Sequence, residues 1–202
     1  MIIHNFEQNT PEWYEVRLGK FTGSDFHTLR GKGITKDAIM HKKAAERITG
    51  TRADADSYTN KHMERGNQLE LDAVIGYELQ TNNIVERVGF VELDQTTGCS
   101  PDGLVGSNGM IEIKCKDNHT FLKYAGKMNI EPTYKTQMQF NMMVCEREWC
   151  DYIVYNPNFE NNIIIQRYHA DNEEQYIIKE KLQELELEIK TIIHNYNNIT
   201  KG

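Results

Sequence analysis

The hydrophobic pattern changes its period twice along the chain, and this change limits the folds that the chain can adopt. Up to about residue 80, apolar residues recur every three or four positions between capping residues, which predicts helices. From Ile84 to about residue 170, short apolar runs lie between turn sequences, and over about 172–196 the helical period returns. This order predicts one domain of mixed α/β (α+β) class, with no internal repeat and no low-complexity linker.

Capping and turn residues give approximate bounds for these elements. The predicted helices follow Thr10-Pro11 and Thr22-Gly23-Ser24, and then cover about 35–50, 59–80, 120–127, 132–147 and 172–196. The predicted strands cover 85–93, 110–115, 152–155 and 163–165, with turns at 98–106 and 107–109. The single domain over 1–202 therefore has N-terminal helices at about 10–80, a sheet core at about 84–170 and a C-terminal helix.

Composition indicates a globular chain that folds without covalent cross-links. The 202 residues are 39% hydrophobic and 26% charged, and no apolar run approaches the roughly 20 residues needed to span a bilayer. The N-terminus lacks the basic and long apolar regions of a signal peptide, so we expect a cytoplasmic protein, in the host cell if it is phage-encoded. The four cysteines form no CxxC pair, and free thiols are expected in that compartment.

The charge distribution restricts where nucleic acid could bind. The formal net charge of −7 excludes a general nucleic-acid binder that uses its whole surface, because Lys and Arg supply most of the affinity for phosphate. Residues 17–52, however, hold nine bases and only three acids. A local basic surface is therefore available to a phosphate backbone.

The chemically most informative part of the chain is Ser100-Pro101-Asp102-Gly103 followed by Glu112-Ile113-Lys114. In a strand, Glu112 and Lys114 point to one face, with their backbone positions about 7 Å apart, while Ile113 points to the opposite, apolar face. The hairpin at 107–109 can bring Asp102 close to Glu112.

Such an arrangement favours a divalent metal ion. Two carboxylates, with the carbonyl of Ile113 as a further ligand, are a minimal hard-oxygen site for Mg²⁺ or Mn²⁺. Lys114 beside them can hold or activate a water molecule, or stabilise charge on a phosphate. The competing interpretation is a surface ion pair on a strand that follows an ordinary Pro-Asp-Gly turn.

Taken together, these segments look like the PD-(D/E)xK nuclease signature, and further segments agree with one family. The chain resembles the phage lambda-exonuclease (YqaJ-like viral recombinase) family over about residues 12–156. The matching segments occur in the family's order at similar spacings and are Trp13-Tyr14-Glu15-Val16-Arg17-Leu18-Gly19, Thr22-Gly23-Ser24, Arg65-Gly66-Asn67-Gln68-Leu69-Glu70, Cys99-Ser100-Pro101-Asp102-Gly103-Leu104, Glu112-Ile113-Lys114-Cys115 and Gln137-Met138-Gln139.

The resemblance implies a role for each matching residue. Glu70 would join Asp102 and Glu112 around two metal ions, one helping to activate water and the other stabilising the leaving oxygen, and Lys114 would orient or activate the water. Gln137 matches the helical glutamine that supports the lysine. Gln139 remains its rival, because residues two apart on a helix face in different directions.

Two further matches concern the end of the DNA. Arg17 and Ser24 occupy family positions that grip the 5′-phosphate of the digested strand. An arginine offers a forked set of donors to phosphate, which suits that task. A helix-terminal charge that interacts with the helix dipole is the alternative for Arg17.

The resemblance also implies a fold and an activity. The fold is a restriction-endonuclease-like core, with a central mixed sheet flanked by helices. The activity is Mg²⁺-dependent 5′→3′ digestion of linear double-stranded DNA, with Mn²⁺ able to substitute, which passes a 3′ single strand to a phage single-strand annealing protein. Several family members form a ring, usually a trimer. One departure is visible: the family often has proline after the cysteine of the strand, where this chain has Lys116.

Three other functions compete with an exonuclease. The same scaffold can act as an endonuclease. A non-catalytic DNA-end-binding module is disfavoured because the acids, the lysine and the glutamine are all present. A thiol–metal protein is disfavoured because the cysteines are scattered and histidines such as His62 and His169 lack ligand spacing.

Overall fold

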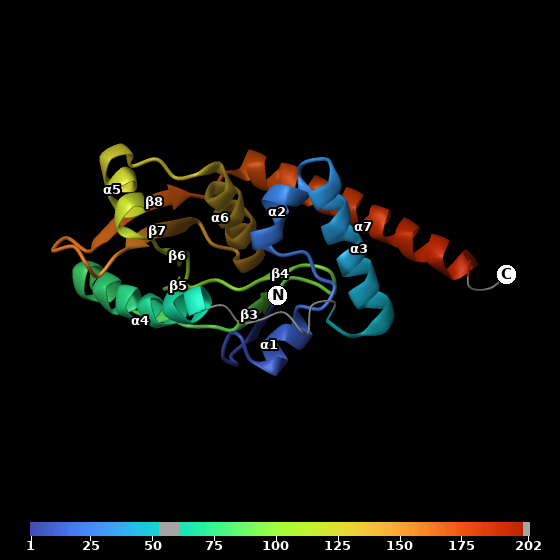
Figure 1. The fold of residues 1–202 in the computed structure, drawn as a ribbon, viewed down its shortest axis with the longest axis horizontal. Helices are drawn as coiled ribbons and strands as arrows, with labels where there is room; N and C mark the ends of the chain where they lie inside the picture. The colour runs from blue at the N-terminus through green and yellow to red at the C-terminus, as the bar shows by residue number, and fades with distance from the viewer. Residues whose placement is uncertain (53–60, 200–202) are drawn as a thin grey trace.

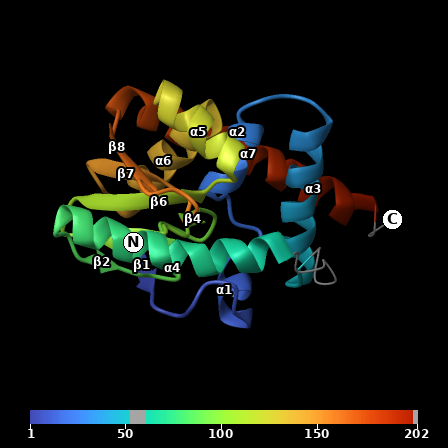
Figure 2. The same ribbon diagram turned by 60° about the vertical axis from the view of Figure 1, so that its left-hand side comes forward.

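A five-stranded mixed sheet lies between helices in the computed structural model, which describes residues 1–52 and 61–199, with the backbone alone for 61–67. Helix α4 (Lys61–Thr81) covers one face of this sheet, and α5 (Asn118–Lys127) and α6 (Pro132–Cys145) lie on the other (Figures 1 and 2). The predicted class and layered arrangement are therefore confirmed. The predicted start of α4 at Thr59 lies outside the described residues.

The order of the large sheet is β2-β5-β6-β7-β8. The bounds of its strands are Val85–Glu86, Gly103–Val105, Gly109–Cys115, Trp149–Tyr155 and Ile163–His169. Strands β6 and β7 are parallel over their full length, whereas the other neighbours are antiparallel. Parallel neighbours need a crossover connection. Here α5 and α6 form this connection between β6 and β7, and α6 therefore packs across the face of the sheet.

A second, three-stranded sheet corrects the prediction of one strand over 85–93. Its order is β1 (Ile2–His4), β3 (Phe90–Glu92) and β4 (Gly98–Cys99), so the predicted strand is divided between two sheets. The division falls near Gly89, where a Cβ atom would lie 2.1 Å from the carbonyl oxygen of Phe6. Strand β1 was not predicted, and the predicted turn over 98–106 contains β4 and β5.

Capping residues define the N-terminal helices. Thr10 caps α1 (Pro11–Val16), as predicted, by accepting a hydrogen bond from the Trp13 N–H. Helix α2 covers Gly23–Leu29. Helix α3 (Ile34–Thr49) begins after Gly33, not at Thr35, because Gly33 adopts a φ of 107° that favours glycine.

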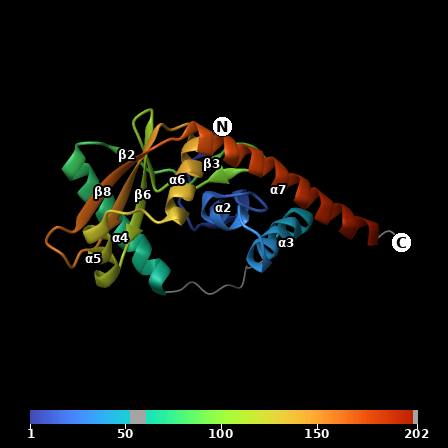
Figure 3. The ribbon, with the colours of Figure 1, turned by 90° about the horizontal axis from the view of Figure 1, so that it is seen from above.

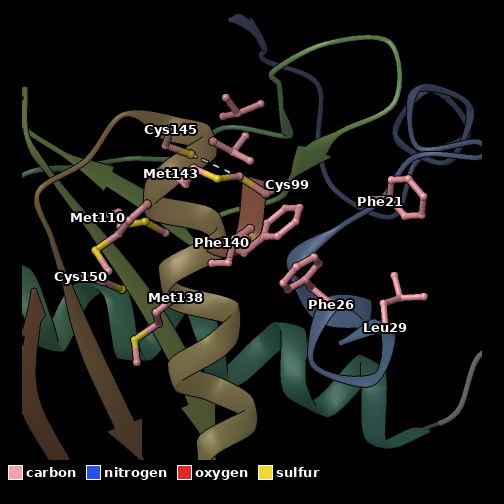
Figure 4. Close-up of a cluster of buried hydrophobic side chains, with 14 of the residues drawn as sticks. Phe21, Phe26, Leu29, Cys99, Met110, Met138, Phe140, Met143, Cys145 and Cys150 are labelled. Atoms are coloured by element: carbon pink, nitrogen blue, oxygen red, sulfur yellow. Dashed lines mark hydrogen bonds between the residues drawn. The ribbon is translucent and has the colours of Figure 1, made fainter. Parts of the chain in front are cut away.

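Two apolar clusters hold these layers together. The larger one joins α2, α3, α6 and α7 to the sheets, and Figure 4 shows Phe26 of α2 against Phe140 of α6, with ring centroids 5.1 Å apart. In the same view Cys99 of β4 approaches Cys145 at the end of α6, with 3.4 Å between the sulfur atoms. All four cysteines are free thiols.

The smaller cluster lies between α4 and the sheet. It contains Ala73, Val74 and Tyr77 of α4 together with Ile111 and Ile113 of β6. The sequence spacing also predicts that Leu79 lies on the apolar stripe of this helix with Leu69 and Ala73, but Leu79 is 78% exposed. Tyr77 takes its place because its hydroxyl donates a 2.8 Å hydrogen bond to the buried carboxylate of Asp151.

The C-terminal helix α7 (Asn172–Ile199) follows the predicted pattern. Its buried residues are Ile178, Leu185 and Ile189. Figure 3 shows it leading away from the sheet alongside α3. Among the described residues, no helix is long and apolar enough to cross a bilayer.

Candidate active site

Strand β6 carries the two residues on which the predicted chemistry depends. Its alternation is as predicted: Ile111 and Ile113 face the α4 cluster, while Glu112 and Lys114 face the opposite side. Glu112 is fully buried, and Lys114 Nζ donates a 2.6 Å hydrogen bond to its Oε1. The buried acid and the partly exposed base therefore form one ion pair on the α6 side of the sheet.

Asp102 lies in the short connection between β4 and β5. The register pairs Gly103 with Ile111, which places Asp102 beside the following part of β6. Its Oδ2 accepts a 2.6 Å hydrogen bond from the backbone N–H of Ile113. Because the N–H and C=O of one strand residue point to the same edge, the carbonyl of Ile113 also lies on the Asp102 side.

Glu70 reaches this region from α4. Its Oε1 lies 2.7 Å from Nη2 of Arg87, which belongs to the connection between β2 and β3. Burial raises the pKa of Glu70 and the charge of Asp102 adds to this shift, while Arg87 and Lys114 oppose it, so that the pKa is about 7. Glu70 and Asp102 are therefore close enough to repel each other.

The three carboxylates share one electrostatic environment. Burial raises the pKa of Glu112 to about 7, with Asp102 and Glu70 adding to the shift and Lys114 opposing it. Burial also raises the pKa of Asp102, against Lys114 and the Ile113 N–H. Burial alone would lower the pKa of Lys114, but the charges of Glu112 and Asp102 outweigh it and raise that pKa above its ordinary value. The site thus has excess negative charge that additional cations would stabilise.

The donor atoms fit a divalent cation, although the carboxylates are not gathered around one point. Among the described residues, no group of three His, Cys, Asp or Glu side chains is arranged to enclose an ion. Glu70, Asp102 and Glu112 each meet a protein donor, but Oε2 of Glu112 is buried with no hydrogen-bond partner in the described part of the chain. A buried carboxylate oxygen without a partner, among hard oxygen atoms, fits Mg²⁺ or Mn²⁺.

A small polar pocket adjoins this acidic group. Arg17 Nη1 donates a 2.9 Å hydrogen bond to Ser100 Oγ, and the Trp13 indole N–H donates to the same oxygen at 2.8 Å. The Arg17 guanidinium lies over the Trp13 ring, 4.1 Å from its centroid. Burial lowers the pKa of Arg17, so its desolvated cation would be stabilised by an anion. The pocket has a volume of about 160 Å³, and its lining includes Arg17, Ser24, Ser100, Gln137 and Asn141.

Helices α2 and α6 form one wall of this Arg17 pocket. Exposed Ser24 is the second residue of α2, and its Oγ lies 3.2 Å from Thr22 Oγ1. A Cβ atom on Gly23 would lie 2.3 Å from Oδ1 of Asn141, so glycine is needed for α2 to approach α6 here. The Thr22-Gly23-Ser24 motif therefore sets the width of the pocket as well as supplying a hydroxyl.

The two candidate glutamines have different surroundings. Gln139 is buried, donates to the carbonyl of His169 at 2.8 Å and accepts from the N–H of Asp171 at 3.0 Å, so it links α6 to the connection before α7. Gln137 instead lines the Arg17 pocket. Lys114 is contacted from α6 by Tyr134, whose ring centroid lies 5.1 Å from Nζ.

Several site residues had not been identified from the sequence. Ser100 and Trp13 both belong to segments that match the family, but the sequence assigns no role to either of them. Asn141 gave no sequence signal, yet its Oδ1 is buried with no hydrogen-bond partner among the described residues and it lines the pocket. Arg87 was missed because it lies in a connection whose path depends on the division between two sheets.

Comparisons with known proteins agree with this arrangement. Residues 12–148 match the family described as YqaJ-like viral recombinase domain. A crystal structure of LHK-Exo, an alkaline exonuclease from Laribacter hongkongensis, is 30% identical, with a TM-score of 0.87 over 95% of this chain and 98% of that one. Its complex with dAMP gives a TM-score of 0.88 at the same identity and coverage.

A more distant structure shares the fold. It is a phage-related exonuclease from Haemophilus somnus 129PT, which is 18% identical with a TM-score of 0.69 over 88% of this chain and 96% of that one. No curated protein matches the sequence significantly.

Proposed function

This chain belongs to the YqaJ-like viral recombinase family, and we propose that it is a Mg²⁺-dependent exonuclease that digests linear double-stranded DNA from the 5′ end. The alkaline exonuclease at 30% identity over nearly the whole chain supports a nuclease acting on DNA. The carboxylates of Glu70, Asp102 and Glu112, together with Lys114, support metal-assisted hydrolysis of a phosphodiester.

One observation favours an exonuclease in particular. Ser100 and Asp102 are two residues apart, yet Ser100 belongs to the Arg17 pocket and Asp102 contacts β6 at Ile113. A terminal phosphate held by Arg17 and Ser100 would therefore lie next to the acidic group. Such a spacing suits removal of nucleotides from a strand end, because the end and the bond to be cleaved are held together.

The residues of the chain would divide the chemistry as follows. Glu70, Asp102, Glu112 and the Ile113 carbonyl would hold the metal ions, which supply Lewis-acid activation of water and neutralise charge at the phosphate. Because its pKa is raised, Lys114 is protonated at neutral pH. We therefore assign it the role of a donor that orients the water or stabilises the phosphate, with Gln137 supporting it from the pocket side.

The activity is tested with Mg²⁺ and three DNAs: linear duplex with a 5′-phosphate, the same duplex with a 5′-hydroxyl, and a closed circle. We expect fast loss of the first, slower loss of the second and an intact circle. Nicking of the circle would instead indicate an endonuclease. Binding of ends without any hydrolysis would indicate a non-catalytic module.

Arg17 provides a separate prediction about the end of the strand. Arg17→Ala should remove most of the preference for the 5′-phosphate, because it deletes the guanidinium that faces the pocket, and we expect a loss of about tenfold or more in discrimination. The measurement is the ratio of initial rates on the 5′-phosphate and 5′-hydroxyl duplexes. Lys179→Ala on α7 is the control, and unchanged discrimination in Arg17→Ala would contradict the assignment.

The remaining parts of the proposal concern assembly. We propose that residues 1–202 act as one nuclease domain, since α7 buries Ile178, Leu185 and Ile189 in the larger cluster. From the family resemblance we also propose a homo-oligomeric ring, with a trimer favoured, and transfer of the 3′ strand to a phage single-strand annealing protein.

A further inference from the structure

A second basic pocket lies beyond the end of β6, on the opposite side of Lys114 from Arg17. Lys116 directly follows the strand, and Lys123 and Lys127 lie four residues apart on α5, on one face of the helix. Together with Tyr124 and Tyr152 they line a cavity of about 230 Å³, here called the Lys116 cleft. The combination of lysines and aromatic rings is typical of surfaces that hold a nucleic-acid strand.

The lysines of this cleft have few acidic partners. Lys123 and Lys127 are exposed, and neither forms an ion pair with any residue that the structure describes. Lys116 Nζ lies 3.7 Å from Oε1 of Glu131, a loose pair because the Glu131 side chain is 60% exposed. The cleft therefore keeps positive charge although the whole chain has a net charge of −7.

The aromatic residues connect this cleft to the catalytic lysine. The Tyr134 ring contacts both Lys114 and Lys116, with its centroid 5.1 Å from Nζ of Lys114 and 4.6 Å from Nζ of Lys116. Tyr134 and Tyr124 both contact the ring of Tyr152, with centroid distances of 5.7 and 5.6 Å. Partly exposed Tyr134 and Tyr124 thus lie on either side of the buried Tyr152 ring, between Lys114 and the cleft.

Helix α6 gives the order of the sites along this surface. Gln137 lies at the Arg17 pocket, Tyr134 lies at Lys114, and Glu131 lies at the Lys116 cleft. Figure 1 shows the same order in the helices, with α6 between α2 and α5. At an extended rise, the backbone positions of Lys114 in β6 and Lys116 directly after it are about 7 Å apart. This distance is comparable with the spacing of successive phosphates along a nucleic-acid strand.

We propose that the Lys116 cleft binds backbone phosphates of the digested strand on the 3′ side of the bond that is cleaved. This inference rests on the proposed function, which places the 5′-phosphate at Arg17 and the scissile phosphate at Lys114. The next phosphates then fall on Lys116, Lys123 and Lys127, and the partly exposed rings of Tyr124 and Tyr134 contact the sugars or bases.

The test measures binding, without metal, of 5′-phosphorylated strands of two and six nucleotides. The dinucleotide has no phosphate beyond the scissile one, whereas the hexanucleotide has four. Wild-type protein should bind the hexanucleotide more tightly. The triple variant Lys116→Ala, Lys123→Ala, Lys127→Ala should lose most of this gain, about tenfold or more, and keep the affinity for the dinucleotide. The slope of log affinity against log salt for the hexanucleotide should fall by about two.

Controls separate this result from a general change in charge. The triple variant Lys179→Ala, Lys181→Ala, Lys190→Ala removes the same charge from α7, which extends away from α5 (Figure 1), and should keep both the gain and the slope. Lys116→Gln alone should lose part of the gain, and Glu131→Gln should increase it. If the cleft variant still binds the hexanucleotide more tightly than the dinucleotide by the wild-type factor, and hydrolyses DNA normally in Mg²⁺, the cleft does not bind the strand and the proposed function stands. Loss of the gain in a protein that hydrolyses no DNA would support the cleft and overturn the proposed function.

Discussion

Replacing Lys114 with alanine should lower the rate of DNA hydrolysis by about 10³-fold and leave the affinity for DNA ends within a few-fold of wild type. Lys114 Nζ lies 2.6 Å from Oε1 of Glu112, and the charges of Glu112 and Asp102 stabilise its protonated form. Most contacts to the DNA end would remain, because Arg17 and Ser100 form a separate pocket. The measurements are single-turnover hydrolysis of 5′-phosphorylated duplex and end binding without metal.

The same change should also affect folding, and a second variant separates the two effects. Removing one partner of a buried ion pair leaves an unpaired charge and typically costs about 3–5 kcal/mol. The double variant Lys114→Met, Glu112→Gln removes both charges and keeps the packing on Tyr134. We expect this folded variant to be equally inactive. A rate of hydrolysis in Lys114→Ala within about tenfold of the wild-type rate would contradict the assignment of Lys114 to the active site.

The sequence predicts which side chains of β6 share one face of the sheet, because this depends only on alternation along the strand. Alternation along a strand fixes the side of Glu112 and Lys114 whatever the neighbours are. The turn at 107–109 also fixed the pairing with β5, which brought Asp102 to the backbone of Ile113. Local periodicity and a short hairpin were sufficient for this part of the site.

Features that depend on distant packing could not be predicted in this way. The break at Gly89 depends on Phe6, which is 83 positions earlier in the chain. The choice between Gln137 and Gln139 depends on the connection at His169, and the role of Asn141 depends on the approach of α2. In each case the deciding contact lies in an element that local sequence patterns do not position.

The charge distribution along the chain has a clearer meaning once the pockets are known. From the basic segment 17–52, Arg17 lines the Arg17 pocket, whereas the Lys116 cleft lies in a region whose overall charge is negative. The acids of the site, Glu70, Asp102 and Glu112, account for part of that negative charge. Net charge therefore excludes binding over the whole surface but says little about a strand held at a few local sites.

Glu112→Gln should abolish hydrolysis and also change how stability depends on pH. In the metal-free protein the pKa of Glu112 is about 7, above its ordinary value of 4.5, so the folded state binds more protons than the unfolded state between these two values. The free energy of unfolding must then fall as pH rises from about 4.5 to 7. Gln does not titrate, so the variant should lose this contribution, on the order of 2–3 kcal/mol.

The measurement is the difference in unfolding free energy between pH 5 and pH 8 in EDTA, for wild type and variant. Using this difference cancels the pH-independent effect of weakening the contact with Lys114. Glu188→Gln is the control, because that carboxylate pairs with Lys36 between α7 and α3, away from the site. Mg²⁺ should stabilise wild type more at pH 8 than at pH 5, since protons compete with the ion for the carboxylates, and should stabilise Glu112→Gln less at both. Equal pH dependence in wild type and Glu112→Gln would show that Glu112 is not the buried acid that titrates near neutral pH.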